Sequence, residues 1–98
     1  MEVPKKKLSD GVEIPTIGFG TWQLEGDICY NAIKNALEVG YRHIDTAYIY
    51  HNHSKVKEAI VDFPREELFF TTKLWREHLA VDKVEFALDL CLKQLGLE

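Results

Sequence analysis

The sequence predicts an α/β fold made of parallel β/α units. Short apolar segments alternate three times with segments whose apolar residues recur at helical spacing, and a glycine or proline closes each helical segment. This alternation makes neighbouring strands parallel, because each helix carries the chain back to the same end of the sheet. The 98 residues, 46% hydrophobic and 29% charged, suit one small globular domain.

A β-hairpin precedes the first unit. Residues 6–8 and 12–14 have the pattern of two short strands, and they flank Ser9-Asp10-Gly11. Asp-Gly is a strong tight-turn pair, because both residues tolerate the backbone conformation that such turns need. Pro15 ends the hairpin.

The first unit opens with a strand at residues 16–20, and the second with a strand at residues 42–44. Gly40 stops the first helix. The second helix has Ser54 near its start as a possible cap, and Pro64 forbids its continuation. The apolar residues at helical spacing are Ile28, Ala32, Ile33, Ala36 and Leu37 in the first helix and Val56, Ala59 and Ile60 in the second.

The third unit has a strand at residues 67–72 and a helix that Gly96 stops. One face of this helix carries Val84, Ala87, Leu88, Cys91 and Leu95. Cys29 lies on the equivalent face of the first helix. Both cysteines are therefore predicted to be buried free thiols rather than a disulfide, which is typical of the reducing cytoplasm.

Parallel β/α units build either an open doubly wound sheet or a closed barrel. The open dinucleotide-binding sheet carries G-x-G-x-x-G after its first strand. Gly18 and Gly20 supply the first two glycines, but Gln23 stands in place of the third. We therefore favour a (β/α)8 TIM barrel with a leading β-hairpin.

A (β/α)8 barrel needs eight units and about 250 residues, whereas this chain supplies about three units. Residues 1–98 are expected to be the N-terminal part of a single barrel domain, apparently truncated. An unclosed barrel of three strands leaves free edges and, we expect, one exposed apolar sheet face. The 98-residue chain alone is then predicted to be poorly stable and prone to associate.

Composition argues against several classes of partner. The formal net charge of −4 argues against nucleic acid, which usually needs a basic face. No apolar run approaches the roughly 18 residues of a membrane span, and the first residues lack the apolar stretch of a secretory signal. These features predict a cytoplasmic protein with neither a membrane nor a nucleic-acid partner.

Polar and aromatic residues follow the carboxyl ends of the three predicted strands, where functional residues of parallel β/α proteins gather. These segments are residues 20–22, 45–47 and 73–75. Asp45 and Lys73 end neighbouring strands, so they are predicted to pair, either as a purely structural ion pair or as part of a site. A lysine ammonium lowers the pKa of a nearby tyrosine, which makes the phenol able to protonate a carbonyl oxygen at neutral pH.

Several segments, in order and spacing, resemble the signature of the aldo-keto reductase family. The matching segments are Gly18-Phe19-Gly20-Thr21-Trp22, Gly40-Tyr41-Arg42-His43-Ile44-Asp45-Thr46-Ala47, Tyr50-His51-Asn52, Arg65-Glu66-Glu67-Leu68-Phe69, Thr72-Lys73-Leu74-Trp75 and Leu92-Lys93-Gln94-Leu95-Gly96-Leu97. Each segment is weakly specific, but together they cover nearly the whole chain.

The resemblance implies a barrel whose bottom is sealed by the hairpin, NADPH as the hydride donor and an aldehyde or ketone as substrate. It places Asp45, Tyr50 and Lys73 at three of the family's four catalytic positions, with Tyr50 rather than Tyr48 as the general acid. It also implies a full-length protein that is a monomer. The remaining expected sites are cofactor contacts at Gly20, Thr21, Trp22 and Asp45, and substrate contacts at Trp22, Tyr50 and Trp75.

The sequence departs from the family pattern after Asn52. The family usually has an acidic residue and soon a glycine there, whereas His53, Ser54 and Lys57 stand here. The family's fourth catalytic residue, a histidine on the fourth strand, and its main cofactor contacts lie beyond residue 98. We therefore expect the 98 residues alone to be inactive.

Three other hypotheses remain at this stage. Lys73 at a strand end also suits a Schiff-base aldolase, although that mechanism needs a lysine with a lowered pKa and Asp45 opposes this. A non-catalytic regulatory protein or pseudo-enzyme is a second alternative. The His51-x-His53 pair invites a metal site, but no cysteine or carboxylate cluster with ligand spacing accompanies it, so no metal is expected.

Overall fold

The computed structural model describes residues 3–97 and begins with the predicted hairpin. Strands β1 (Lys5–Lys7) and β2 (Glu13–Pro15) pair antiparallel, with Lys6 opposite Ile14. At the turn Gly11 has φ of 90°, a backbone conformation that residues with a side chain rarely adopt. The Val12 amide donates to Asp10 Oδ1 at 3.0 Å. The turn chemistry read from the sequence is confirmed.

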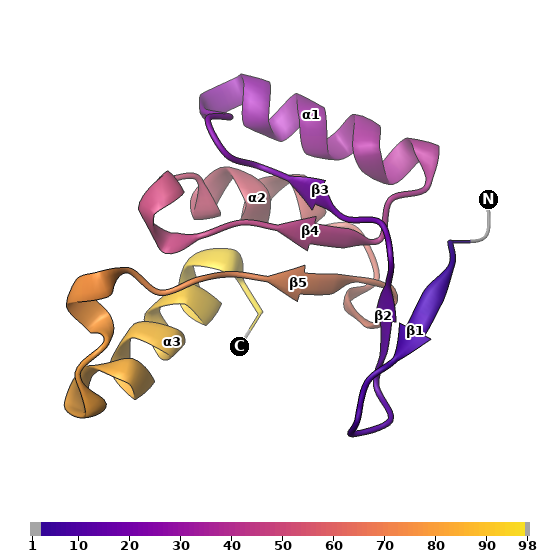
Figure 1. The fold of residues 1–98 in the computed structure, drawn as a ribbon. Helices are drawn as coiled ribbons and strands as arrows, with labels where there is room; N and C mark the ends of the chain where they lie inside the picture. The colour runs from indigo at the N-terminus through magenta and orange to yellow at the C-terminus, as the bar shows by residue number, and fades with distance from the viewer. Residues whose placement is uncertain (1–2, 98) are drawn as a thin grey trace.

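The next three strands form one parallel sheet in the order β3-β4-β5 (Figure 1). Their bounds are Phe19–Gly20, His43–Asp45 and Phe69–Thr71. The first strand is shorter than the predicted residues 16–20. Its start turns toward the hairpin instead, because the Thr16 amide donates to the Pro4 carbonyl at 2.9 Å.

Three α-helices follow the three strands, as predicted, with bounds Gly26–Val39 for α1, His53–Ile60 for α2 and Val81–Leu95 for α3. Gly40 ends α1 with φ of 115°, and Gly96 ends α3 with φ of 71°, so both predicted stops are confirmed. The predicted cap Ser54 is wrong. Asn52 occupies the N-cap position of α2, and Ser54 is exposed in its first turn.

The helices cover one side of the sheet and enclose the core. Figure 1 shows α2 behind the strands, with α1 and α3 on either side of it. Both cysteines are fully buried and free, as predicted. Ile28, Val84 and Leu88 were expected on the buried faces but are exposed. The core consists of Cys29, Ile33, Leu37, Ile44, Val56, Ala59, Ile60, Leu68 and Leu95.

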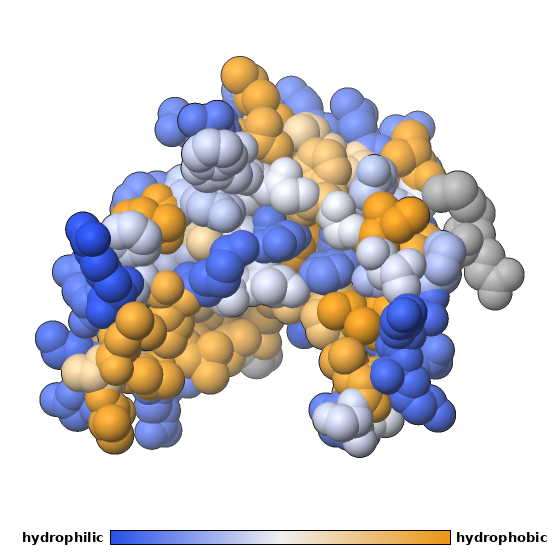
Figure 2. Space-filling view, in the orientation of Figure 1, coloured by the Kyte–Doolittle hydropathy of each residue, from blue (hydrophilic) through white to orange (hydrophobic). Residues whose placement is uncertain are grey.

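The other side of the sheet is more polar than we expected: it carries His43, Asp45 and Thr71, although Phe69 also lies there with its ring edge-on to His43. Ile44 points toward the helices and is fully buried, so His43 and Asp45 on either side of it point the opposite way. His43 Nε2 bonds to Thr71 Oγ1 on the neighbouring strand at 2.7 Å. Figure 2 shows hydrophilic surface across the middle of this view, over the three strands. In the part of the chain described, no helix has the length and hydropathy to cross a membrane.

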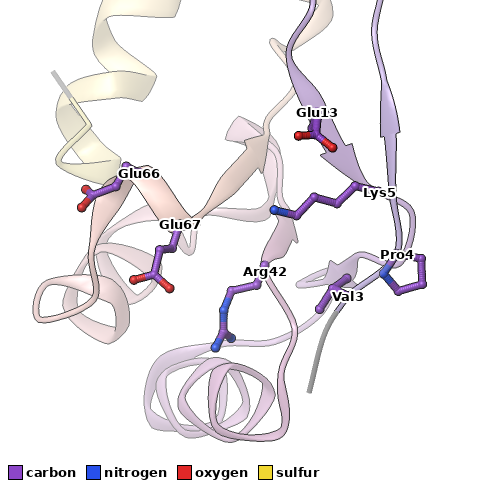
Figure 3. Close-up of a pocket in the computed structure, with 7 residues that line it drawn as sticks. All are labelled: Val3, Pro4, Lys5, Glu13, Arg42, Glu66 and Glu67. Atoms are coloured by element: carbon purple, nitrogen blue, oxygen red, sulfur yellow. The ribbon is translucent and has the colours of Figure 1, made fainter.

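A hollow of about 860 Å³ lies at the amino-terminal end of the strands (Figure 3). It separates the hairpin from the starts of β4 and β5. Its lining is mostly charged and consists of Val3, Pro4, Lys5, Glu13, Arg42, Glu66 and Glu67. The functional end of a parallel β/α sheet is the opposite, carboxyl-terminal end. Size alone therefore does not make this hollow the site of the chemistry.

Candidate active site

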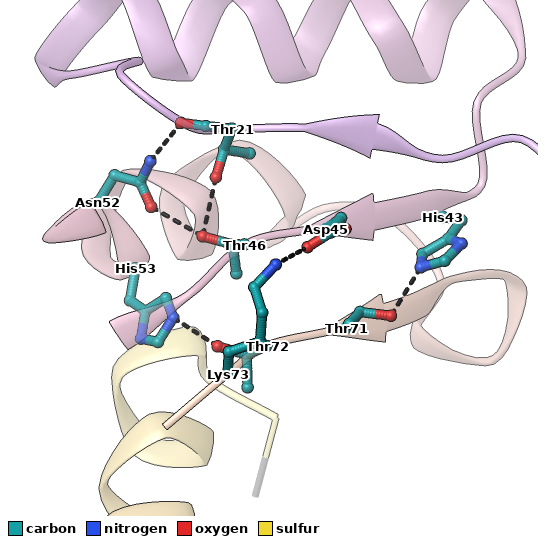
Figure 4. Close-up of polar contacts among 9 residues, drawn as sticks. All are labelled: Thr21, His43, Asp45, Thr46, Asn52, His53, Thr71, Thr72 and Lys73. Carbon is teal, nitrogen blue, oxygen red and sulfur yellow. Dashed lines mark hydrogen bonds and ion pairs between the residues drawn. The ribbon is translucent and has the colours of Figure 1, made fainter. Parts of the chain in front are cut away.

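An ion pair joins the carboxyl ends of β4 and β5. Asp45 is the last residue of β4 and lies opposite Gly20 on β3 and Thr71 on β5. Lys73 follows β5 by two residues, and its Nζ donates to Asp45 Oδ1 at 2.5 Å (Figure 4). The Lys73 side chain remains 49% exposed and that of Asp45 43% exposed. The predicted pair exists, and a small molecule at the rim has access to both charges.

Tyr50 lies beside this pair. It closes a 3-10 turn, Tyr48–Tyr50, whose first amide donates to the Lys73 carbonyl at 3.0 Å. The Lys73 Nζ is 5.5 Å from the centre of the Tyr50 ring. The hydrogen bond to Asp45 raises the pKa of Lys73, burial works against this, and Tyr50 adds a further rise. A phenol, an ammonium and a carboxylate are therefore grouped at one rim.

The state of Lys73 bears on the Schiff-base alternative. That mechanism needs an unprotonated amine at neutral pH, whereas Asp45 raises the pKa of Lys73 and favours the ammonium. An ammonium has no free electron pair with which to attack a carbonyl carbon. The geometry is suited to holding a positive charge near Tyr50, and it speaks against an aldolase.

A buried polar network lies directly beneath the rim. The Thr21 hydroxyl donates to Thr46 Oγ1 at 2.8 Å, and the Thr46 hydroxyl donates to Asn52 Oδ1 at 2.9 Å. The Asn52 amide donates to the Thr21 carbonyl at 2.9 Å and to the Leu24 carbonyl at 3.1 Å. Thr21, Thr46 and Asn52 are at most 1% exposed. Because the Thr21 hydroxyl is used internally, it is not free to bind a cofactor.

Trp22 projects from a tight turn above this network. The Leu24 amide donates to the Thr21 carbonyl at 3.0 Å, which closes the turn. Gln23 has φ of 64°, a left-handed conformation that is uncommon for a residue with a side chain. Trp22 is 67% exposed. The structure thus presents the indole to solvent at the rim, and its role as a wall of a substrate pocket stays a prediction.

The second candidate wall, Trp75, lies after β5 at the start of the 3-10 turn Arg76–His78. The Arg76 guanidinium is 5.0 Å from the centre of its ring. The Trp75 amide donates to His78 Nδ1 at 3.3 Å, and the His78 ring packs edge-on against Tyr48 at 4.7 Å. Within residues 3–97, no hydrogen bond or ring contact joins Trp75 to Tyr50. Its place in a pocket with Tyr50 stays a prediction.

His53 connects α2 with α3 and with the segment that follows β5. Its Nδ1 lies 2.8 Å from Gln94 Oε1 on α3, and its Nε2 lies 3.0 Å from Thr72 Oγ1 at the end of β5. An amide oxygen only accepts, so Nδ1 donates and Nε2 accepts from the Thr72 hydroxyl. Burial lowers the pKa of His53, and the bond to Gln94 works against this. The ring is therefore a neutral packing element, and the described residues hold no cluster of three metal-binding side chains.

Comparison with known proteins identifies the family. The pattern of the Aldo/keto reductase family matches residues 16–98, so the chain belongs to that family. Glycerol 2-dehydrogenase (NADP(+)) of Saccharomyces cerevisiae is 52% identical over 93% of the chain, and an aldehyde reductase of the same yeast is 48% identical over 94%. The chain spans 29% and 30% of the lengths of these two relatives.

Solved structures show the same fold. An aldo/keto reductase from Brucella melitensis, 44% identical, superposes on 97% of the chain with a TM-score of 0.90. An aldo-keto reductase of Bombyx mori in complex with NADP, 39% identical, superposes on 99% with a TM-score of 0.91. The chain covers 38% and 36% of these two structures. These aldo-keto reductases are (β/α)8 barrels, so the predicted fold class is confirmed.

Sequence reasoning missed the residues of the buried network. Thr46 and Asn52 belong to the quoted family segments, but neither was assigned a role. A threonine and an asparagine at predicted loop positions are usually exposed, and nothing in the local pattern marks them as buried. The one available signal was their position beside Asp45 and Tyr50, at the end of the sheet where functional residues gather.

Proposed function

We propose that these residues form part of an NADPH-dependent oxidoreductase that reduces aldehyde or ketone carbonyls to alcohols. The observation that carries the proposal is the Lys73 ammonium bonded to Asp45 and facing Tyr50 at the carboxyl ends of adjacent parallel strands. The names of the yeast relatives, a glycerol 2-dehydrogenase and an aldehyde reductase, support this reaction class.

Each residue of the group has a distinct role in the proposal. Tyr50 donates a proton to the carbonyl oxygen as negative charge develops there. The Lys73 ammonium favours the phenolate that is left, because an opposite charge nearby stabilises the ionised form. Asp45 holds the ammonium charged and oriented. Trp22, Tyr50 and Trp75 line the substrate pocket and limit its contact with water.

The rim also suits the proposed cofactor. A Cβ placed on Gly20 would meet nothing within 4 Å, so the backbone at the end of β3 is open to close approach by a flat ring. Gly20 pairs with Asp45 in the sheet, and the Asp45 carboxylate is a hydrogen-bond acceptor at the same edge. In our proposal Gly20, Trp22 and Asp45 hold the nicotinamide end of NADPH. Thr21, also expected at the cofactor, is fully buried, and its hydroxyl, amide and carbonyl are all bonded within the protein, so it supports this end of the site from below. When bound, NADPH supplies the hydride that reduces the carbonyl carbon.

A Tyr50→Phe substitution in the full-length protein tests the acid. Phenylalanine keeps the ring but removes the proton donor, so kcat for aldehyde reduction is expected to fall by at least about 100-fold. NADPH binding, followed by quenching of protein fluorescence, is expected to survive. Steady-state oxidation of NADPH with an aromatic aldehyde measures the loss.

Tyr48→Phe is the matched control, because it removes the same hydroxyl two residues away, from a ring that packs on His78. It is expected to keep most of the activity. Undiminished turnover in Tyr50→Phe would exclude Tyr50 as the acid. A wild-type protein that binds NADPH but reduces no carbonyl would favour the non-catalytic alternative, and borohydride trapping of a substrate on Lys73 would favour the aldolase.

The proposal extends to the organisation of the protein. Residues 1–98 form the N-terminal part of a single barrel domain, and the full-length protein is a monomer whose partner is a small carbonyl compound. A single species at monomer mass in sedimentation of the full-length protein is the expected result.

A further inference from the structure

We propose that Asn52 is a positioning residue that sets the place of the Trp22 turn relative to Tyr50. This inference rests on the proposed reductase function. Asn52 is the buried side chain beneath the rim that makes the most hydrogen bonds. Asn52 is 1% exposed and makes three side-chain hydrogen bonds. Figure 4 shows its carboxamide directed at Thr21 and Thr46, between the loops that follow β3 and β4.

The side-chain amide of Asn52 donates hydrogen bonds to both ends of one turn. Trp22 and Gln23 are the central residues of this turn, and Thr21 and Leu24 are its ends. The Asn52 amide donates to the Thr21 carbonyl and to the Leu24 carbonyl. Gln23 adopts a left-handed conformation, and a residue with a side chain keeps such a conformation only where its surroundings enforce it. The amide of Asn52 supplies that enforcement from across 31 residues of sequence.

Asn52 is also linked, through the backbone, to Tyr50, the proposed acid. Asn52 follows Tyr50 by two residues, through His51, which has φ of 55°. The Asn52 Oδ1 accepts from Thr46, the residue after Asp45. The Asn52 carbonyl accepts from the Lys55 and Val56 amides at 3.0 Å each, so α2 holds the backbone of Asn52 in place. One side chain therefore fixes the Trp22 wall, the segment beside Asp45 and the segment bearing Tyr50 in a single arrangement.

This arrangement is built for position rather than for contact with substrate. Asn52 is buried and all of its side-chain polar groups are used internally, so it acts through Trp22 and Tyr50. The rate of a reaction between oriented groups depends steeply on their placement, and a displacement of about 1 Å lowers it on the order of 100-fold. Loosening the Trp22 turn is expected to lower the rate even though Tyr50, Lys73 and Asp45 remain.

Asn52→Asp in the full-length protein tests the proposal. The aspartate keeps the size of the side chain and the acceptor for Thr46 but loses both donors to the turn. We expect kcat/KM for an aromatic aldehyde to fall by about tenfold or more, with most of the loss in kcat. Asn35→Asp makes the same chemical change at an exposed position on α1 and is expected to keep wild-type kinetics.

A double-mutant cycle with Trp22→Ala separates positioning from general damage. If Asn52 acts by placing Trp22, Asn52→Asp loses most of its effect once the indole is gone. The fold loss in kcat/KM that Asn52→Asp causes is then expected to be about fivefold smaller in the Trp22→Ala background than in the wild-type background. Equal factors in both backgrounds, or no loss from Asn52→Asp in the wild type, would overturn the proposal.

Amide hydrogen exchange gives a readout that does not depend on turnover. Asn52→Asp is expected to speed exchange in peptides covering residues 21–26 by about tenfold, while Asn35→Asp leaves them unchanged. If the wild type reduces no carbonyl, the proposed function fails. Unchanged exchange in Asn52→Asp would independently refute the proposal that Asn52 holds the Trp22 turn in place. If Asn52→Asp does not fold, Thr46→Val removes the donor to Asn52 Oδ1 and is expected to show the same coupling at smaller size. Additive effects of Thr46→Val and Trp22→Ala on kcat/KM would, in that case, refute the proposal that Asn52 holds the Trp22 turn in place.

Discussion

At the scale of single residues, Asp45 and Lys73 make an ion pair that remains about half exposed. Ion pairs in such positions typically contribute about 0–1 kcal/mol to folding, because water already stabilises both charges. The pair matters more for where it puts the charge. It keeps Lys73 protonated beside Tyr50, where the proposed proton transfer leaves a negative phenolate.

His53 predicts a specific loss of stability in mild acid. Burial lowers its pKa below the usual value of 6.5, so the unfolded chain binds a proton there more readily than the folded protein does. The stability that neutral His53 provides is complete above pH 6.5 and is lost as the pH falls through the lowered folded value. We expect the free energy of unfolding, measured by urea denaturation of the full-length protein, to drop on going from pH 7 to pH 5.

The drop is expected to be smaller in His53→Gln, because glutamine is polar but does not titrate. His51→Asn is the matched control. It removes an exposed histidine two residues away, and asparagine tolerates the left-handed backbone at that position. This control is expected to keep the wild-type pH dependence. If the free energy of unfolding falls equally between pH 7 and pH 5 in the wild type and in His53→Gln, then His53 does not contribute to this pH dependence.

At the scale of elements, each of the two longer helices ends on a glycine in the left-handed backbone conformation, which residues with a side chain rarely adopt. Gly40 has φ of 115°, and its amide lies within bonding reach of the Ala36 and Leu37 carbonyls. Gly40→Ala is expected to lower the free energy of unfolding by about 1–2 kcal/mol, because the added Cβ strains this conformation. Denaturant unfolding of the full-length protein measures the change.

Asn35→Ala in the same helix serves as the comparison, since residue 35 is exposed and lies within regular helix. Its effect is expected to stay within about 0.5 kcal/mol of zero. If Gly40→Ala proves as stable as Asn35→Ala, the left-handed end of α1 does not carry the strain that we assign to it.

At the scale of the whole molecule, the described residues 3–97 form a slab of 42 × 36 × 21 Å. Its thickness accommodates little more than one sheet and one layer of helices. Leu79, Val81 and Phe86 are 66%, 97% and 71% exposed on the segment from the 3-10 turn into α3. Figure 2 shows orange apolar surface gathered over this part of the molecule, at lower left. Apolar patches of this kind usually bind another surface.

We expect the 98-residue polypeptide to associate as its concentration rises and to melt over a broad temperature range. Sedimentation velocity and calorimetry measure these properties. Val81→Lys is expected to weaken association, whereas Ile28→Lys, which changes an exposed residue on α1, leaves it unchanged. A sharp melt of a monomer at all concentrations would contradict this expectation.

Local chemistry made much of the fold predictable. The Asp10-Gly11 turn, the apolar face around Cys29 and Ile33, and the glycine stops at residues 40 and 96 depend on neighbours within a few residues of each other. The motif order from residue 18 to residue 75 indicated the family, and strand ends at a shared edge predicted that Asp45 meets Lys73. Such inferences succeed because spacing along a helix or strand translates directly into position in space.

The buried network and the polar open face of the sheet depended on tertiary structure. Asn52 meets Thr21 across 31 residues and His53 meets Gln94 across 41, and no local pattern encodes those contacts. Ser54 looked like a possible helix cap because its side chain suits that position. Asn52 takes the position instead, while its side chain bonds to the Trp22 turn. Sequence alone thus determined which chemical groups reach the rim. Packing between distant segments decided how they are held there, because a buried polar group must find whichever partners the folded chain brings to it.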